Sequence, residues 1–293
     1  MYKLRFENEN GNIITLSGAE DRYQILNMEG LNPPNANIYQ SPVAGMDGTK
    51  YMSSKLEARN IVLTVKINGE VERNRLNLYS YFKTKHWSKM YYSNGSREVA
   101  IEGYVETVEC NLFSQSEQMQ ISIICPDPYF QSLKEIITDI SKVTPNFEFP
   151  FAFGAEGVDT PTITDEAIEF SIYEKDRIVN VINEGEDETG LIIKVTATGE
   201  VVNPTIYNSV TREAFSLNMT LERNDILTIN TNKGQKSVTL LHDTVLTNCI
   251  NKVVRDSSWL TLGKGDNLFT YDAEVGSASM HIVFTHRTRY QGV

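Results

Sequence analysis

The fold of this chain is decided by the stretch Gln118-Met119-Gln120-Ile121-Ser122-Ile123-Ile124-Cys125-Pro126-Asp127-Pro128-Tyr129-Phe130. Apolar side chains stand at every second position, at Met119, Ile121, Ile123 and Cys125. A period of two is typical of a β-strand with one buried face. The two prolines that follow have no backbone N–H to donate to a sheet, so the strand is expected to end at Cys125.

The same period recurs over 59–67, where Ile61, Leu63, Val65 and Ile67 share one face. After this strand, the spacing of Val71, Leu78, Tyr79 and Phe82 predicts one amphipathic helix packed over a sheet, with Lys83, Lys85 and His86 in its last turn. Before it, residues 32–48 are rich in turn-forming residues, and we interpret 32–56 as a long loop. Long loops in compact domains are usually functional or mobile, and this one is a candidate for binding.

The alternation stops after Phe130, and prolines then punctuate the chain. We therefore predict a domain over 1–133, a linker over 134–146 and a second domain over 147–293. Turn signals in the second part separate ten short strands, predicted at 167–174, 178–183, 189–198, 204–208, 213–219, 225–231, 236–241, 245–251, 266–271 and 279–286. Strands at this spacing favour a β-sandwich or barrel, so the fold class is mainly β in both parts.

Chemistry-bearing motifs are not apparent in the sequence. The three cysteines are scattered and predict reduced, buried side chains rather than disulfides or a zinc site. The acidic run over 184–188 lacks the spacing of a calcium loop and is interpreted as a solvated turn. We expect no catalytic residue, no metal and no cofactor.

Charge and hydropathy exclude several classes of partner. The net charge is −11, of which residues 1–133 carry −2 (13 Lys and Arg against 15 Asp and Glu) and residues 134–293 carry −9 (14 against 23). An acidic chain is poorly suited to grip nucleic acid. The N-terminus lacks the apolar core of a signal peptide, and no run approaches the ~20 apolar residues of a membrane span. We therefore expect a protein made in a cytoplasm without membrane insertion.

Several segments together resemble the distal tail protein family of long-tailed phages. The resemblance covers nearly the whole chain and is carried by 94–95, 101–106 and 118–130, and by the segments Leu26-Asn27-Met28-Glu29-Gly30-Leu31, Ser54-Lys55-Leu56-Glu57-Ala58-Arg59-Asn60-Ile61 and Trp259-Leu260-Thr261-Leu262-Gly263-Lys264-Gly265-Asp266-Asn267. It implies an N-terminal split-barrel or β-sandwich domain with one α-helix. It also implies a C-terminal β-sandwich like that of galectins or carbohydrate-binding modules.

The resemblance also implies a structural role rather than an enzymatic one. Copies of the chain would form a ring, a hexamer, at the tail tip of a virion assembled in the cytoplasm of a Gram-positive host. The ring would join the tail tube protein to a tail-associated tip protein, and would hold receptor-binding or baseplate proteins.

Two sets of residues are candidates for binding. An extended arm or an edge strand can add to a neighbour's sheet. The candidate ring interface therefore lies on the predicted loop and on the strand after it, at Tyr39, Tyr51, Arg59, Val62 and Lys66. Trp259 is the candidate carbohydrate contact. The alternative function, a carbohydrate-binding adsorption module that recognises the bacterial cell wall, depends on this residue. The favoured interpretation of this tryptophan is that it packs in the core.

Overall fold

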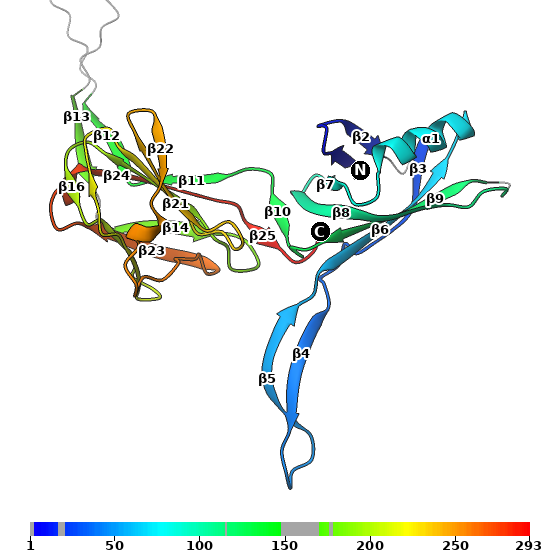
Figure 1. Ribbon diagram of the computed structural model, residues 1–293, viewed down its shortest axis with the longest axis horizontal. Helices are drawn as coiled ribbons and strands as arrows, with labels where there is room; N and C mark the ends of the chain where they lie inside the picture. Colours follow the sequence, from blue (N-terminus) through cyan, green and yellow to red (C-terminus); the bar gives the residue numbers. More distant parts are fainter. Residues whose placement is uncertain (1–2, 17–20, 115, 148–169, 176–177) are drawn as a thin grey trace, which may run out of the picture. The chain divides into compact units, whose positions relative to one another are not determined.

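The computed structural model describes residues 3–16, 21–114, 116–147, 170–175 and 178–293. The described chain is mainly β, and it divides into two compact units. The first unit is Met1–Glu135 together with Glu184–Glu188 and Arg287–Val293, and the second is Ile136–Asn183 together with Thr189–His286. Each unit is described by itself below (Figure 1).

The described residues of the first unit form twelve labelled elements, eleven strands and one helix. They are β1 (Lys3–Asn8), β2 (Ile13–Leu16), β3 (Tyr23–Glu29), β4 (Ala36–Pro42), β5 (Thr49–Leu56), β6 (Arg59–Ile67), α1 (Val71–Tyr81), β7 (Trp87–Ser93), β8 (Glu98–Cys110), β9 (Gln118–Cys125), β10 (Phe130–Ser132) and β25 (Arg289–Tyr290). Seven strands form an antiparallel path in the order β2-β1-β7-β8-β9-β6-β3, and β10 joins both β8 and β25. The predicted strands at 59–67 and 118–125 are confirmed as β6 and β9.

One face of this sheet and helix α1 enclose the core of the first unit. The alternating apolar residues of β6 and β9 lie in it, as the period of two predicts. Leu78 and Phe82 bring the helix into the same core, and the Phe82 ring meets Phe6 edge-on with centroids 5.4 Å apart. The N–H of Phe82 makes the last helical bond, to the carbonyl of Leu78, and the helix ends at Tyr81 because Phe82 itself has φ −96° and ψ 76°, outside the helical region.

The prediction that Lys83, Lys85 and His86 occupy the last helical turn is therefore wrong. These residues lie beyond Tyr81, and Lys85 adopts a positive φ that no helix continues. The stripe of apolar residues was correctly assigned, but the basic residues do not stabilise the helix dipole from within the helix.

The second unit contains β11 to β24. They are β11 (Ile136–Asp139), β12 (Ser141–Phe147), β13 (Phe170–Lys175), β14 (Ile178–Asn183), β15 (Ile192–Ala197), β16 (Val201–Val202), β17 (Thr205–Asn208), β18 (Glu213–Ser216), β19 (Thr220–Leu221), β20 (Ile226–Asn230), β21 (Ser237–His242), β22 (Val245–Asn248), β23 (Gly265–Asp272) and β24 (Met280–His286). Two short 3-10 turns, Ile250–Lys252 and Ser277–Ser279, lie between the last strands.

Two antiparallel sheets of the second unit share one core. A six-stranded sheet has the order β11-β24-β15-β20-β21-β22, and a four-stranded sheet has the order β14-β23-β17-β18. Buried side chains from both sheets form a single cluster, in which the rings of Phe269 on β23 and Phe284 on β24 lie 4.8 Å apart. This arrangement is a β-sandwich.

All ten strands predicted for this part coincide with observed strands, although 167–169 of the first one lie outside the described residues. In the loop between β20 and β21, Gly234 has a φ of 81°, which glycine adopts without strain.

The predicted linker contains ordered strands. Residues 136–139 form β11, which pairs with β24 at the edge of the six-stranded sheet, and 141–147 form β12, which pairs with β13. Short apolar runs such as Ile136-Ile137 gave too few alternating positions for a strand to be recognised. The division into domains at 1–133 and 147–293 stays a prediction, and residues 148–169 lie outside the described part of the chain.

Candidate assembly surface

Residues 36–56 form a two-stranded hairpin rather than the predicted loop. Strands β4 and β5 pair antiparallel from Ala36 opposite Leu56 to Pro42 opposite Thr49, with a bulge after Tyr39. The turn between them places Gly45 and Gly48 at positive φ, which glycine adopts without strain. We call this hairpin the arm; it projects from the sheet of the first unit (Figure 1).

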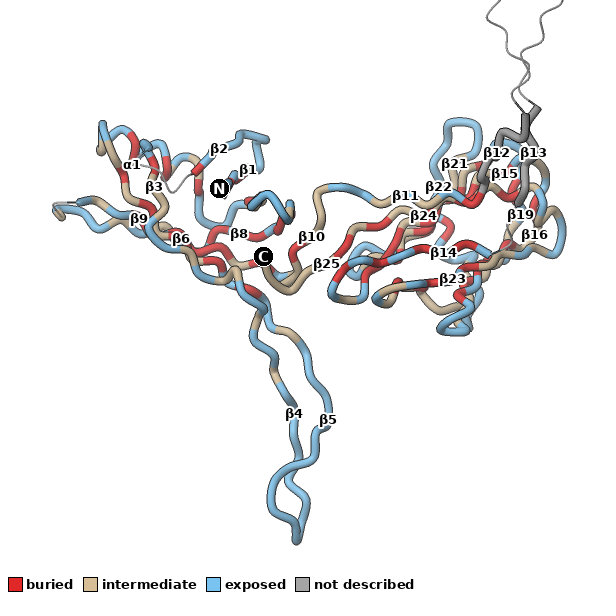
Figure 2. The backbone as a smooth tube through the Cα atoms, turned by 180° about the vertical axis from the view of Figure 1, so that it is seen from behind, coloured by how far each residue is buried: buried red, intermediate tan, exposed pale blue. Residues whose placement is uncertain are grey.

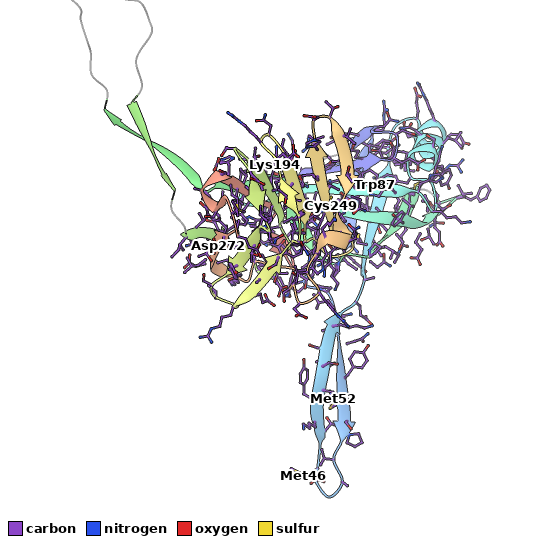
Figure 3. The ribbon with its side chains drawn as sticks, turned by 60° about the vertical axis from the view of Figure 1, so that its left-hand side comes forward. Met46, Met52, Trp87, Lys194, Cys249 and Asp272 are labelled. Atoms are coloured by element: carbon purple, nitrogen blue, oxygen red, sulfur yellow. The ribbon has the colours of Figure 1, made fainter. Side chains whose placement is uncertain are left out.

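The arm is exposed along its whole length. Strands β4 and β5 pair only with each other, and only Asn37 and Leu56 are partly buried. Figure 2 shows this continuous exposure, and Figure 3 shows Met46 at the turn and Met52 on β5. Six large apolar side chains on the arm are exposed to solvent, with the exposed fraction given for three of them: Ile38 (57%), Tyr39, Val43, Met46 (72%), Tyr51 and Met52 (61%).

Such a hairpin has little intrinsic support. An isolated two-stranded hairpin is marginally stable in water, and the arm has no buried face to stabilise it. Each strand also leaves its outer backbone groups unpaired, which suits pairing with a further strand. Contiguous exposed apolar side chains mark interaction sites in soluble proteins. The arm therefore has the features of a segment that gains its stability from a partner.

The candidate interface residues do not form one surface. Tyr39 and Tyr51 are exposed on the paired strands of the arm, where Gln40 lies opposite Tyr51. Val62 and Lys66 are half-buried on β6, on the face away from the core. Strand β6 is hydrogen-bonded to β3 on one side and β9 on the other, so the expectation that it can add to a neighbour's sheet as an edge strand is wrong.

Arg59 is buried, with 3% of its surface exposed, and so has no surface to offer a neighbouring chain. Its guanidinium lies over the Phe130 ring, 4.6 Å from the centroid, and its N–H groups donate to main-chain carbonyls of the same unit. Burial lowers the pKa of Arg59 from its ordinary value. We therefore correct its assignment from interface contact to structural residue.

Trp259 packs on the sandwich core of the second unit. Its ring lies 5.1 Å from the ring of Phe215, and the Lys236 ammonium stands 5.2 Å from its centroid. The tryptophan is half-buried. A sugar that stacked on this ring would have to displace the lysine, so the geometry fits core packing better than carbohydrate contact.

The acidic run over 184–188 is more than the solvated turn that we predicted. Glu186 pairs with Arg97 at 3.0 Å, and Asp187 accepts hydrogen bonds from Tyr129 and Gln291. Burial alone would raise the pKa of Asp187, but these hydrogen bonds outweigh it and hold the pKa below its ordinary value. In the described part of the chain, no group of three or more metal-binding side chains comes together.

None of the helices in the described ranges has the length and the apolar character of a membrane span.

A weak signal in the sequence could have revealed the arm. Two short runs, Ile38-Tyr39 and Tyr51-Met52, contain residues of high β-propensity and flank a turn that contains glycine. The signal was weak because an arm exposed on both faces shows no polar-apolar alternation.

Two family models match the sequence. Residues 19–125 match a phage tail protein RIFT-related domain, and residues 184–290 match the C-terminal domain of a siphovirus-type tail component. The first match lies within the first unit, and the second includes the acidic run and β25. No curated protein matches the sequence.

Solved structures share the fold over nearly the whole chain. The Dit protein of phage SPP1, described as a paradigm of the hub adsorption apparatus in phages that infect Gram-positive bacteria, aligns with a TM-score of 0.67 and 12% identity over 98% of this chain and 99% of its own. A chain of the phage P2 baseplate, activated with Ca, aligns with a TM-score of 0.53 and 10% identity over 100% of both chains. A chain of the phage p2 baseplate with Sr gives 0.50 and 10% over 97% and 98%.

Proposed function

We propose that this chain, which belongs to the siphophage distal tail protein family, forms a ring at the tail tip that joins the tail tube to the tip or baseplate proteins. Its coarser role, a structural component of a phage tail, follows from the family. The ring, its hexameric state, its place at the tip and its neighbours in the tail are the proposed part. We propose a structural role without enzymatic activity.

The exposed arm carries this proposal. A cyclic ring needs head-to-tail contacts, in which one surface of each subunit complements a different surface of the next. A hairpin with open edges and apolar side chains can supply one of these surfaces by reaching across to the neighbouring chain. The arm holds two lysines and one aspartate, so charge repulsion between copies is small at this contact.

The net charges of the two compact units differ less than the net charges of the two halves of the sequence. The first unit carries 16 Lys and Arg against 20 Asp and Glu, a net of −4, and the second carries 11 against 18, a net of −7. The difference is smaller than the sequence halves suggested, because the acidic run over 184–188 belongs to the first unit. The more acidic second unit would suit the outside of a ring, where copies are less crowded, but this difference in charge is small and the arm remains the main argument.

The alternative function, a carbohydrate-binding adsorption module, depended on Trp259. The packing of this ring against Phe215 and Lys236 lends it no support. The two functions predict different oligomeric states in solution, because a scaffold protein assembles whereas an adhesin can act as a monomer.

The test is the size of the full chain by light scattering after size-exclusion chromatography, with and without an arm substitution. We expect the chain to oligomerise, and Ile38→Ser combined with Met52→Ser to shift the equilibrium at least tenfold toward monomer, since buried apolar anchors dominate interface energy. Ile13→Ser is the matched control, because Ile13 is also 57% exposed but lies on β2 away from the arm.

A wild-type chain that stays monomeric at high micromolar concentration, even when mixed with the tube protein of its own phage, would contradict the ring. An oligomer that the arm substitutions leave intact would contradict only the role of the arm.

A further inference from the structure

Residues 287–293 return from the second unit to the first, and we call them the strap. They follow β24 in the chain, and within them β25 pairs with β10, with Phe130 opposite Tyr290. The acidic run over 184–188 returns to the first unit in the same way. The first unit is therefore completed by two pieces of the C-terminal part of the chain.

The end of the strap lies against the residues that lead into the arm, 30–33, which we call the arm root. The N–H of Val293 donates to the carbonyl of Leu31 at 3.2 Å. A Cβ atom added at Gly292 would lie 3.2 Å from Cδ of Pro33, so glycine permits this close approach. The C-terminus is marked near the start of the arm in Figure 1 and in Figure 2.

Arg59 joins the strap to the arm root from inside the unit. Its Nη1 donates to the carbonyls of Gly30 (2.5 Å) and Asn32 (2.6 Å), both in the arm root. Its Nη2 donates to the carbonyl of Gln291 in the strap at 2.5 Å. Its Nε donates to the carbonyl of Pro128 at 2.8 Å.

These four acceptors are neutral, so the buried charge depends on having all of them in place. A buried donor that loses its acceptor keeps the full cost of its desolvation. If the strap leaves, one guanidinium N–H group is stranded. The remaining bonds to the arm root then lose the geometry that orients Arg59. The strap and the arm root are thus energetically coupled through one side chain.

A second set of contacts holds the strap in place without touching the arm root. Arg97 stacks on the Tyr290 ring at 4.1 Å, donates to the carbonyl of Gly292 at 2.6 Å and pairs with Glu186 at 3.0 Å. Glu186 also accepts the N–H of Gln291 at 3.0 Å. The acidic run therefore anchors the strap to the first unit through Glu186.

We propose that the strap is a conformational latch that fixes the root of the arm, so that the order of residues 29–37 depends on a segment at the opposite end of the chain. With the latch closed, the arm leaves the sheet from a rigid base. With the latch open, its root becomes mobile. The proposal concerns a single chain and does not depend on ring formation.

The test is hydrogen exchange of the full chain, measured by mass spectrometry on peptides that cover 29–37 and 287–293. Arg97→Gln loosens the strap without removing any contact of the arm root. Gly292→Val separates the two by crowding Pro33 and Leu31. Both variants are expected to raise exchange over 29–37 by about fivefold to thirtyfold, which corresponds to a loss of about 1–2 kcal/mol in local stability.

Lys89→Gln is the matched control. Lys89 also makes an ion pair, with Glu102 at 2.8 Å, and stands over a tyrosine, Tyr91, in the same sheet, but it has no contact with the strap. Exchange over 29–37 should be unchanged in this variant. Unchanged exchange over 29–37 in both strap variants would overturn the latch, as would an equal rise in Lys89→Gln, which would indicate general loosening.

Discussion

The guanidinium of Arg59 donates to the carbonyl of Gln291, a residue 232 positions further along the chain. This single bond links strand β6 to the strap, two segments that are far apart in the sequence. A fragment that ends at residue 133 would lack this acceptor, together with the ion pair between Arg97 and Glu186. Experiments on assembly should therefore use the full chain rather than the two sequence halves.

Arg59→Gln is expected to destabilise the first unit strongly. The substitution leaves several buried carbonyls without a donor and removes the cation from the Phe130 ring. Hydrogen bonds to charged groups contribute about 1.5–3 kcal/mol each, so we expect a loss of roughly 3 kcal/mol or more in unfolding free energy. Urea denaturation followed by circular dichroism measures it.

Arg73→Gln is the control for that substitution, because the ion pair of Arg73 with Glu70 is exposed and such pairs contribute about 0–1 kcal/mol. Similar midpoints for the two variants would show that burial of Arg59 has no energetic weight.

Gly30→Ala is expected to be far more costly than the same change at Gly11. Both glycines have positive φ, so both substitutions carry the strain of a left-handed alanine, about 1 kcal/mol. At Gly30 the new Cβ would also fall 2.1 Å from the carbonyl oxygen of Asn60, whereas at Gly11 it would meet nothing within 4 Å. The difference in melting temperature between the two variants isolates the steric part. Equal melting temperatures would contradict the close approach of the arm root to β6.

Acid is expected to destabilise the chain through His286. This side chain is buried at the end of β24, and burial lowers its pKa below the ordinary 6.5. The unfolded chain therefore binds a proton more readily than the folded one, and stability should fall as pH drops below about 6.5. His286→Leu should flatten the pH dependence of unfolding between about pH 7 and 5.

His242 provides the opposite sign as an internal comparison. It bonds Asp225 at 2.6 Å, and the hydrogen bond to this carboxylate raises its pKa. Its contribution is present in full below about 6.5 and is lost as pH rises through the raised pKa. His242→Gln should therefore remove the loss of stability that occurs as pH rises above about 6.5, and leave the acid loss below about 6.5 that His286 causes. A His286→Leu variant with the wild-type pH profile would show that His286 is not the group responsible.

Cell-wall polysaccharide is expected not to perturb Trp259. Its ring packs against Phe215, and the Lys236 ammonium stands over it, so a sugar that stacked there would have to displace the lysine. We expect tryptophan fluorescence to stay constant during titration with purified polysaccharide of the host. The measurement is best made on a Trp87→Phe variant, which leaves Trp259 as the only tryptophan. A saturable change in that variant would instead favour the adsorption module.

Ten strands of the second unit, together with β6, β9 and α1 of the first, could be predicted from the sequence because their signals are local, whereas β11, β12, β16 and β19 were missed. Each strand buries one face, and burial of one face forces polar and apolar residues to alternate with the period of the backbone. The stripe that carries Leu78 and Phe82 follows the helical period for the same reason. Family segments spread along the chain added the fold class.

Only the tertiary structure decided the arm, the strap and the burial of Arg59. The arm has no buried face, so Ile38 and Met52 show no alternation that marks a strand. The acceptors of Arg59 are main-chain carbonyls, which every residue carries, so no residue type at 30, 32, 128 or 291 reveals them in advance. The periodicity of a sequence indicates which face of a strand or helix is buried, but it does not indicate which distant main-chain groups a side chain contacts.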